Sequence, residues 1–527
     1  MIYAIYAFVI IAAIGFAVAY IYTTLIKDYS PKTTMKRTND MYDLKKLKNE
    51  LVYADADSGL PLVFYGDHSK RKVEKSAYQL DLPAYRITNE ERGLIVGVSG
   101  TGKTNFILAQ IFDWMQSGKS LVVVDVKPEI WAILETNDIF NVSGYEPIVI
   151  NPTDPYTDKY NFLDDVDFND LDEMLSVIIA DSNDNAVAFN EFARRLLKVI
   201  IFYLKDKNGS VSLTACYEFI NSYSRTKTMF DDLKASNNED IKAMINLVLQ
   251  AADNERFLSS GMNALTSALS MFNDKTISTM TRRSDFSLNE VLKQERKIVF
   301  LQFEQLAQDK TASLFAMTVQ HLIRLMMKNH HERDDVFIIL DELTNSSTIP
   351  CLPTQFNLMR AYKMPAFVYV QTISSLYTMF GRERAQHLMN SCSLKIFYRT
   401  NDFETAKEFS NVSGEVEAQE LHHSYSSEVR KDGSSFMKKS VTPAGLKNVP
   451  LIPPTEIMQL GAGKVVCICR GHAAVVEIPQ MWKHTPITER TVFNSPRDIF
   501  DTDDYRECYE TDLMTLYMRF EDEDYAA

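Results

Sequence analysis

The sequence predicts an α/β fold in which a parallel-rich central sheet carries an inserted, all-α domain. Three observations support this prediction. A glycine-rich loop stands between a short apolar strand and a helix, further runs typical of buried parallel strands recur along the chain, and the stretch 168–288 has helical periodicity. The chain of 527 residues is too long for one ordinary core, which agrees with two or more folded units.

Composition narrows the possible functions. Hydrophobic residues make up 46% and charged residues 24% of the chain, which is ordinary for globular proteins. The six cysteines include no C-x-x-C pair, which argues against zinc ribbons and disulfide frameworks, so Cys467 and Cys469 are interpreted as packed thiols. The net charge of −14 disfavours a broad nucleic-acid surface, because phosphate contact needs local positive charge that a ring or channel would have to concentrate.

The N-terminus predicts one transmembrane anchor, residues 1–28. Ile2–Ile26 contains no charged residue and, at ~1.5 Å per residue, spans roughly 37 Å as a helix, enough for the ~30 Å hydrocarbon core. A cleaved signal peptide is the alternative, but there is no basic region before the apolar run, which is also too long. Basic residues follow the span and none precedes it, which favours a cytoplasmic location for the bulk of the chain: Lys27, Lys32, Lys36, Arg37, Lys45, Lys46 and Lys48.

Residues 29–92 are mixed and charged and are interpreted as a membrane-proximal connector. After them, Gly93–Val96 is a short apolar strand and Thr104–Met115 has helical spacing. The loop between them matches a phosphate-binding pattern: Gly97, Val98, Ser99, Gly100, Thr101, Gly102, Lys103 and Thr104. The glycines let backbone N–H groups turn toward phosphates, Lys103 can reach the β and γ phosphates, and the Thr104 hydroxyl can bind Mg²⁺. The pattern therefore predicts a nucleoside triphosphate and Mg²⁺ as cofactors.

Two further strands, Ser120–Asp125 and Pro147–Ile150, extend the predicted parallel sheet. The period then becomes helical over 168–288, and the strand signal returns at Ile298–Leu301. The helical stretch is too long for a connection, so we expect an inserted domain between two parts of the sheet domain, 93–167 and 289–485.

The run Val336–Leu340 predicts a buried strand that ends in two carboxylates, Asp341 and Glu342. Ligands bind at the carboxyl ends of strands in open α/β sheets. We expect Asp341 to hold Mg²⁺, through water, and Glu342 to polarise the attacking water. Two solvated acids after a strand are common, so this motif has weight only together with the phosphate loop.

Another strand, Ala366–Val370, ends at Gln371, which is suited either to orienting water near a γ phosphate or simply to ending the strand. Arg360 is a candidate arginine finger for a neighbouring subunit, with Arg382 and Arg384 as rivals. A surface salt bridge is the alternative for each arginine.

Three predictions concern the C-terminal part. The serine, lysine and glycine content of 424–439 predicts an exposed loop, and Val465–Cys469 with Ala474–Ile478 predicts a hairpin. Residues 486–527 form an acidic tail.

Several motifs together resemble the type IV secretion coupling proteins, the TraG/TraD family of membrane-anchored ATPases in the FtsK/HerA-like group. The resemblance runs from Gly93 to Trp482. Besides the phosphate loop and Leu340-Asp341-Glu342, it includes Asp125–Glu129, Asn151-Pro152, Tyr160–Leu163, Phe189–Ala193, Ile349-Pro350, Gln371, Ser374–Leu376, Gly381 and Leu451–Ile457.

The resemblance implies a RecA-like P-loop NTPase that hydrolyses ATP with Mg²⁺ in a homo-hexamer at the bacterial inner membrane. It also implies that the motor passes relaxase-bound single-stranded DNA or effector proteins to a type IV secretion channel. By the same resemblance, Lys103 and Thr104 belong to the nucleotide loop, Asp341 and Glu342 are the metal and water acids, Gln371 is the sensor and Arg360 completes a neighbour's site. Such proteins commonly have two membrane helices, whereas only Ile2–Ile26 qualifies here.

Two other functions remain compatible with the sequence. One is a double-stranded DNA pump of the FtsK/HerA kind, which the helical insert and the anchor disfavour. The other is a substrate-docking receptor in which the nucleotide site mainly stabilises a ring.

Overall fold

The computed structural model describes most of the chain from Arg92 onward and four short strands before it. The described residues are 32–37, 52–53, 60–62, 85–87 and 92–478, with gaps at 127, 168–169, 182–185, 252–254, 304–307, 333–334, 344–348, 350, 363 and 430–434. The predicted anchor (1–28) and acidic tail (486–527) lie outside these residues. No helix in the described part is long and apolar enough to cross a membrane.

A nine-stranded sheet forms the centre of the molecule, in the order β15-β14-β11-β5-β10-β9-β6-β8-β7. All neighbouring pairs from β11 to β7 are parallel, whereas β14 pairs antiparallel with both β11 and β15. The strands are β5 Arg92–Val96, β6 Leu121–Val124, β7 Glu146–Ile150, β8 Lys297–Leu301, β9 Phe337–Leu340, β10 Ala366–Val370, β11 Leu394–Phe397, β14 Lys464–Cys469 and β15 His472–Glu477. The parallel-rich sheet and the terminal hairpin are thus confirmed.

Helices cover both faces of this sheet. Alternate strand residues point to opposite sides, so Ile95 and Val123 belong to one core and Leu94 and Val122 to another. Because both faces are buried, the strands are apolar throughout. The first core is completed by α3 Lys103–Met115, α4 Glu129–Thr136 and α5 Ile139–Ser143. The second is completed by α14 Gln308–Lys328, α15 Leu352–Leu358, α16 Ile373–Phe380, α17 Arg382–Ser391, α18 Phe403–Ser413 and α19 Pro454–Met458.

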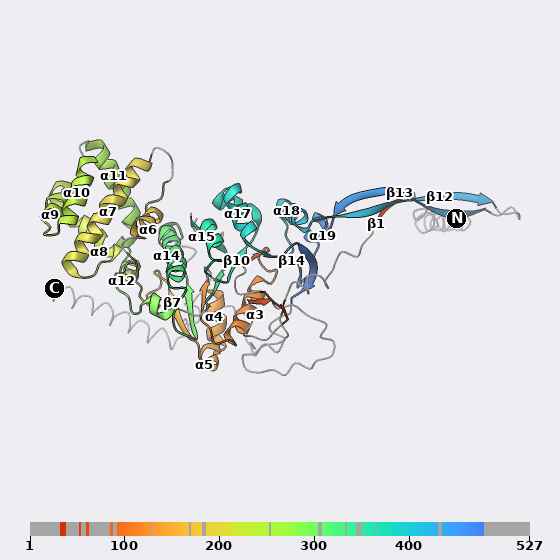
Figure 1. Ribbon diagram of the computed structural model, residues 1–527, viewed down its shortest axis with the longest axis horizontal. Coiled ribbons are helices and arrows are strands. Elements are labelled where there is room, and N and C mark those ends of the chain that lie inside the picture. Colours follow the sequence, from red (N-terminus) through yellow and green to blue (C-terminus); the bar gives the residue numbers. More distant parts are fainter. Residues whose placement is uncertain are drawn as a thin grey trace, which may run out of the picture.

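A helical bundle lies between β7 and β8 in the chain and at one end of the molecule (Figure 1). Its helices are α6 Leu171–Ile178, α7 Val187–Asn208, α8 Leu213–Asn221, α9 Thr226–Lys234, α10 Glu239–Ala251, α11 Glu255–Leu269, α12 Lys275–Arg282 and α13 Leu288–Val291. The apolar stripe of α7 is buried, and α10 and α11 pack against it. The division at 168 and 288 remains a prediction.

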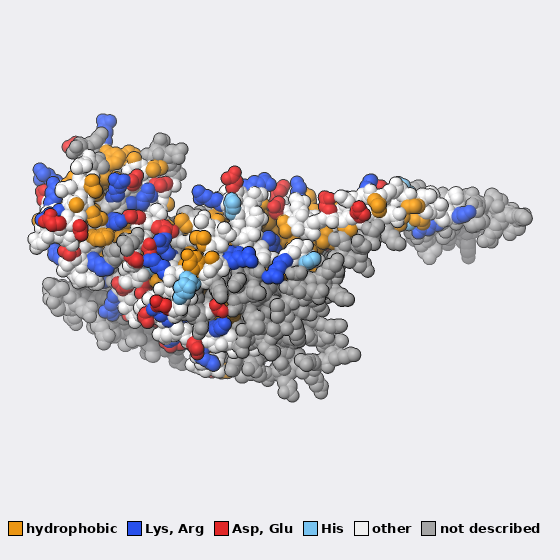
Figure 2. Space-filling model, in the orientation of Figure 1, with side chains coloured by type: hydrophobic (Ala, Val, Ile, Leu, Met, Phe, Trp, Pro, Cys, Tyr) orange, Lys and Arg blue, Asp and Glu red, His pale blue; other side chains and the backbone are white. Residues whose placement is uncertain are grey.

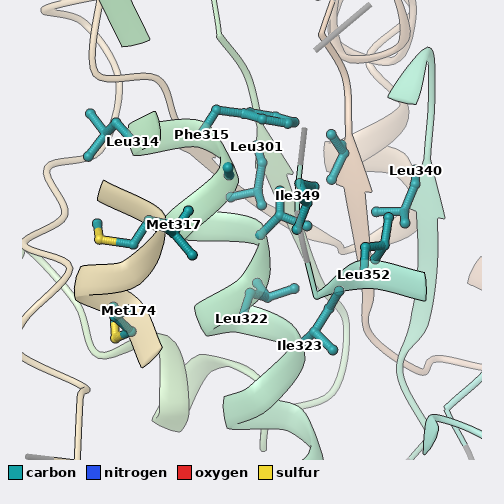
Figure 3. Packing of buried hydrophobic residues seen from close by; sticks show 14 of the residues in the cluster. Met174, Leu301, Leu314, Phe315, Met317, Leu322, Ile323, Leu340, Ile349 and Leu352 are labelled. Atoms are coloured by element: carbon teal, nitrogen blue, oxygen red, sulfur yellow. The ribbon is translucent and has the colours of Figure 1, made fainter. Parts of the chain in front are cut away.

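Helix α14 joins the bundle to the sheet. Its side chains lie between Met174 of α6 and the strand residues Leu301 and Leu340, with Leu352 of α15 beside them (Figure 3). The apolar residues of the bundle and of this sheet face therefore form one continuous core.

A long antiparallel ribbon, β12 Glu415–Val429 and β13 Ser435–Pro450, projects from the other end of the molecule (Figure 1). Strand β1 Lys32–Arg37 pairs with β12, so the ribbon is three-stranded along part of its length. The loop predicted over 424–439 is therefore wrong outside 430–434. Polar residues occur on both faces of the ribbon, so the sequence lacks the alternating apolar pattern that predicts a strand. The strands are held together by cross-strand pairing. Within the predicted connector, β2 Val52–Tyr53, β3 Leu60–Leu62 and β4 Tyr85–Ile87 form a small antiparallel sheet.

Candidate nucleotide-binding site

The phosphate loop connects β5 to α3, as the sequence predicts. Gly100 and Gly102 have φ angles of 77° and 106°, a region that favours glycine. Within the loop, Thr101 Oγ1 donates to the Val98 carbonyl at 2.7 Å and Lys103 Nζ donates to the Gly97 carbonyl at 2.5 Å. These bonds hold the loop curved over the N-terminus of α3, where backbone N–H groups and the helix dipole favour phosphate.

Tyr398, directly after β11, forms a wall behind the loop. Its ring is buried, its hydroxyl donates to the Gly102 carbonyl at 3.3 Å, and its backbone N–H donates to the Val96 carbonyl at 2.8 Å. A Cβ added to Gly97 would lie 2.6 Å from Tyr398 Cβ. The first glycine of the loop is thus required by packing, and Tyr398 fixes the position of both ends of the loop.

The two predicted acids follow β9 at the same edge of the sheet. Asp341 is partly buried and Glu342 is 8% exposed. Glu342 has a φ of 46°, and its N–H donates to Asp341 Oδ1 at 2.9 Å. This strained backbone turns the second carboxylate away from the strand direction, so the two acids do not simply alternate across the sheet.

Gln371 stands between the loop and the acids, because β10 lies between β5 and β9. Its Nε2 donates to Glu342 Oε1 at 3.5 Å, a long hydrogen bond. The structure therefore brings together the loop Gly97–Thr104, Asp341, Glu342 and Gln371 at the carboxyl ends of three adjacent strands. This is the place where open α/β sheets bind ligands.

A third carboxylate lies next to this pair. Asp125 follows β6, the strand beside β9, and is fully buried; its Oδ2 accepts from the Trp131 N–H at 3.1 Å. Burial raises the pKa of Asp125 well above its ordinary value, and the charges of Asp341 and Glu129 raise it further. Burial also raises the pKa of Asp341 to about 7, the Glu342 charge adds to this shift, and Lys103 opposes it.

This arrangement is suited to a divalent cation. Crowded, desolvated carboxylates repel each other, and Mg²⁺ prefers hard oxygen ligands such as carboxylates, hydroxyls and waters. Asp341 and the Thr104 hydroxyl at the start of α3 offer such oxygens, so the residues present fit the predicted metal. Within the described residues no separate cluster of metal-ligating side chains occurs.

Arg360 is not part of this edge of the sheet. It follows α15, whose last carbonyls, those of Phe356 and Asn357, accept hydrogen bonds of 2.6 and 3.0 Å from Arg92 Nη1 at the start of β5. The turn carrying Arg360 therefore lies where the parallel strands begin, whereas the phosphate loop lies where they end. Arg360 is exposed, and so are the rival candidates Arg382 and Arg384 at the start of α17.

The sequence did not identify Tyr398 and Asp125 as site residues. Asp125 follows a predicted strand, and its position beside Asp341 depends on strand order, which only the fold reveals. Tyr398 follows β11, a short strand with no strong sequence signal. A polar or aromatic residue directly after a parallel strand is the one signal that would have directed attention to them.

Comparison with known proteins identifies the family of this chain. A sequence model described as type IV secretory system conjugative DNA transfer matches residues 48–480. The chain belongs to this family. Membership of the type IV conjugative DNA transfer family confirms the resemblance noted from the motifs and assigns the chain to DNA-transfer machinery. No curated protein matched the chain.

Solved structures support the fold of this type IV DNA transfer protein. An unbound form of the bacterial conjugative coupling protein TrwB, lacking its first 70 residues, has a TM-score of 0.58 and 15% identity over 87% of this chain and 100% of that one. TrwB in complex with the non-hydrolysable GTP analogue GDPNP has a TM-score of 0.56 and 16% identity, covering 81% and 96%. TrwB with ADP and Mg²⁺ gives the same values. This likeness establishes a shared P-loop NTPase fold.

Proposed function

We propose that the chain is a membrane-anchored ATPase that couples substrates to a type IV secretion channel. The observation that carries this proposal is the joint placement of the phosphate loop, Gln371 and the Asp341–Glu342 pair at one sheet edge, in a member of a conjugative DNA-transfer family. The complexes of TrwB with ADP and Mg²⁺ and with nucleotide analogues support ATP and Mg²⁺ as the ligands of the corresponding loop here.

Each site residue has a proposed role. Lys103 would bind the β and γ phosphates, and Thr104 with Asp341 would hold Mg²⁺, which would supply positive charge to neutralise the phosphates. Glu342 takes the proton of the attacking water or orients it, and Gln371 positions that water between the loop and Glu342. Tyr398 keeps the loop in shape for these contacts. Since none of these groups forms a covalent intermediate, catalysis depends on positioning and electrostatics.

The assembly that we propose is a homo-hexamer held at the bacterial inner membrane by Ile2–Ile26, with the bulk of the chain cytoplasmic. Its ring would receive relaxase-bound single-stranded DNA or effector proteins. Most of the predicted insert, 168–288, lies apart from the nucleotide site (Figure 1), so we assign substrate or adaptor binding to this domain. In a chain of net charge −14, capture of a protein partner is easier to support than tight binding of bare DNA.

The proposal is tested by ATP turnover of the full chain, with and without single-stranded DNA. Removing the water-activating acid in Glu342→Gln should lower kcat by roughly 10²-fold or more while ATP still binds, and Lys103→Thr should weaken ATP binding itself. Glu404→Gln, an exposed change at the start of α18, is the matched control and should retain parental activity.

Three results would contradict this assignment. Parental turnover by Glu342→Gln would remove that residue from catalysis. A parent chain that binds ATP but never hydrolyses it, with or without DNA, would instead support a docking receptor whose nucleotide is structural. Stimulation by double-stranded but not single-stranded DNA would favour a duplex pump.

A further inference from the structure

Three polar residues form a row across the carboxyl ends of adjacent strands. Gln302 directly follows β8, Asp125 follows β6 and Asp341 follows β9, and β6 lies between the other two strands. The strand ladder continues through all three residues, since each backbone N–H donates to a carbonyl of an adjacent strand. The acceptors, each at 3.0 Å, are Ile150, Leu301 and Val124, in that order. We call Gln302, Asp125 and Asp341 the polar row.

The polar row lies on one face of the sheet. The residues two positions before its members belong to the core on the α3 side: Phe300, Val123 and Ile339. Since alternate residues of a strand face the same way, the members of the row lie on the α3 side too. Helix α3 begins with Lys103 and Thr104 of the phosphate loop. The row therefore leads away from the nucleotide site, from Asp341 through Asp125 to Gln302.

The two members of the row beyond Asp341 are buried and incompletely bonded. Asp125 and Gln302 each have an exposed fraction of 0%. Within the part of the chain that the structure describes, Asp125 Oδ1 and both polar side-chain atoms of Gln302 have no hydrogen-bond partner. Native proteins satisfy nearly all of their buried polar groups, because an unsatisfied one is costly. Three such atoms on two neighbouring residues indicate a polar ligand at this place.

Helix α4 fixes the direction of the Asp125 carboxylate. Asp125 Oδ2 accepts a hydrogen bond of 3.1 Å from the backbone N–H of Trp131, in the first turn of α4. This bond satisfies one of the orphan donors at the start of the helix. One carboxylate oxygen is thus engaged by α4, and the other, Oδ1, remains for a ligand.

The acidity of the chain as a whole does not account for two carboxylates side by side in the row. Over the helical bundle, basic and acidic side chains are interspersed on the surface, where water screens them (Figure 2). Asp125 is instead fully buried beside the strand that carries Asp341. A buried charge needs a specific compensating group, so the pair favours a cation over an anion.

The hydrogen-bonding chemistry of the row narrows the ligand further. Asp125 Oδ1 and Gln302 Oε1 accept hydrogen bonds, and Gln302 Nε2 donates them. Water molecules around a cation meet both demands, because they are good donors and each also has a lone pair. Mg²⁺ loses its waters reluctantly and usually keeps several of them in a protein site. It is also the cation that we propose for Asp341.

We propose that Asp125 and Gln302 are positioning residues that hold water molecules around the Mg²⁺ of the nucleotide site. This inference rests on the proposed Mg²⁺ site at Thr104 and Asp341. Asp125 Oδ1 accepts from these waters, and Gln302 extends the network by one strand. The network restrains the cation on the side of β6 and β8, whereas Gln371 acts on the opposite side of β9, from β10. Partners of this kind, one step beyond the direct ligands, strengthen metal binding about 10- to 100-fold.

The test compares nucleotide affinity with and without Mg²⁺. The full chain is titrated at pH 8 with a fluorescent ADP analogue, once in excess Mg²⁺ and once in EDTA. The ratio of the two dissociation constants is the Mg²⁺ enhancement. Asp125→Asn keeps an oxygen for the Trp131 N–H and loses the charge. We expect it to lower the enhancement about tenfold or more, while the affinity in EDTA is unchanged or higher.

Two further variants complete the comparison. Gln302→Met has a similar size without the polar atoms and should lower the enhancement about threefold or more. Asp113→Asn is the matched control, because it also removes a buried carboxylate, 3% exposed, but ten residues from Lys103 along α3, or about 15 Å. It should leave the enhancement unchanged. Parental enhancement in Asp125→Asn would overturn the proposal. So would equal weakening with and without Mg²⁺, which is the effect of a purely structural residue.

Failure of the proposed metal site is distinguishable from failure of this inference. Asp341→Asn should abolish the enhancement, since it removes a direct ligand. Parental enhancement in Asp341→Asn would refute the proposed Mg²⁺ ligand and, with it, the network that depends on it. Loss of the enhancement in Asp341→Asn together with parental values in Asp125→Asn and Gln302→Met would keep the Mg²⁺ site and refute the network alone.

Discussion

At Gly97 the fold leaves no room for a side chain, because Tyr398 Cβ would lie 2.6 Å and Thr101 Oγ1 2.9 Å from an added Cβ. We therefore expect Gly97→Ala to displace the loop, to cost roughly 1–3 kcal/mol of stability, and to weaken ATP binding about tenfold or more. Thermal melting and calorimetric titration with ATP measure both effects. Gly461→Ala is the control, since the nearest atom to its added Cβ lies 3.9 Å away. ATP affinity of Gly97→Ala equal to that of the parent would show that the loop tolerates the displacement.

The raised pKa of Asp341, about 7, gives the site a pH dependence. Mg²⁺ binds the ionised carboxylate, so Mg²⁺-dependent nucleotide binding should strengthen about tenfold between pH 6 and pH 8. Without metal, the free energy of unfolding should instead decrease as the pH rises. A carboxyl whose pKa is raised by folding contributes stability below its unfolded pKa and loses it as the pH rises through about 7.

Asp341→Asn separates these two effects. At pH 8 without Mg²⁺ this variant should melt ~2 °C or more above the parent, because the crowded charge beside Glu342 and Asp125 is gone. It should also lose the stabilisation that Mg²⁺ with nucleotide gives the parent. An Asp341→Asn melting temperature below that of the parent at pH 8 would show that the Asp341 charge is stabilised by groups other than Mg²⁺.

At the scale of elements, α14 carries a row of polar contacts to the segment that enters the helical bundle. Gln320 donates to Glu173 at 3.0 Å, Arg324 pairs with Asp170 at 2.6 Å, and Lys328 pairs with Asp167 at 2.8 Å. Next to them, His321 is buried, with its Nε2 3.3 Å from the Tyr160 hydroxyl. The exposed Lys328–Asp167 pair is worth little by itself. The buried His321 is the group of this junction whose pKa makes it sensitive to pH.

Burial lowers the pKa of His321 to about 4, although the nearby Asp165 opposes the shift. Between pH 6.5 and 4 the unfolded chain binds a proton at this histidine that the folded chain does not bind. The free energy of unfolding should therefore decrease as the pH is lowered through this window, by up to ~3 kcal/mol. His321→Gln should remove this part of the pH dependence, whereas the exposed His387→Gln should not. Melting curves recorded from pH 7 to pH 4 measure the difference, and identical slopes for parent and His321→Gln would assign the loss to other groups.

Elements differed in how well the sequence predicted them, for physical reasons. Strands buried on both faces are apolar throughout, so β6, β8 and β10 were recognised within one residue of their observed ends. The outer part of the β12–β13 ribbon was predicted as a loop over 424–439, since polar residues there lie on both faces and the strands are stabilised by pairing with each other. Asp125 and Tyr398 could not be assigned to the site, because local sequence predicts where strands occur but not which strands are neighbours in the sheet.

At the scale of the whole molecule, the helical bundle and the ribbon lie at opposite ends of the sheet domain, with the phosphate loop between them (Figure 1). The position of Arg360 bears on how subunits would be arranged. It lies where the parallel strands begin, and it makes no ion pair among the described residues. Five-residue strands span about 17 Å, so Arg360 does not reach its own phosphate loop. A role in catalysis requires a neighbouring subunit, as in a ring built from heterologous contacts.

Mixing two inactive subunits tests that role. Arg360→Ala keeps a working loop, and Lys103→Thr keeps a working arginine, so each alone should be nearly inactive. In rings mixed one to one, a working loop faces a working arginine at about a quarter of the interfaces, and we expect ATP turnover to recover up to that fraction of the parental rate. Arg195→Ala, an exposed arginine of the bundle, is the control and should stay active by itself. Co-assembled rings without any recovery would exclude Arg360 as the finger, and Arg382→Ala and Arg384→Ala would then enter the same complementation with Lys103→Thr.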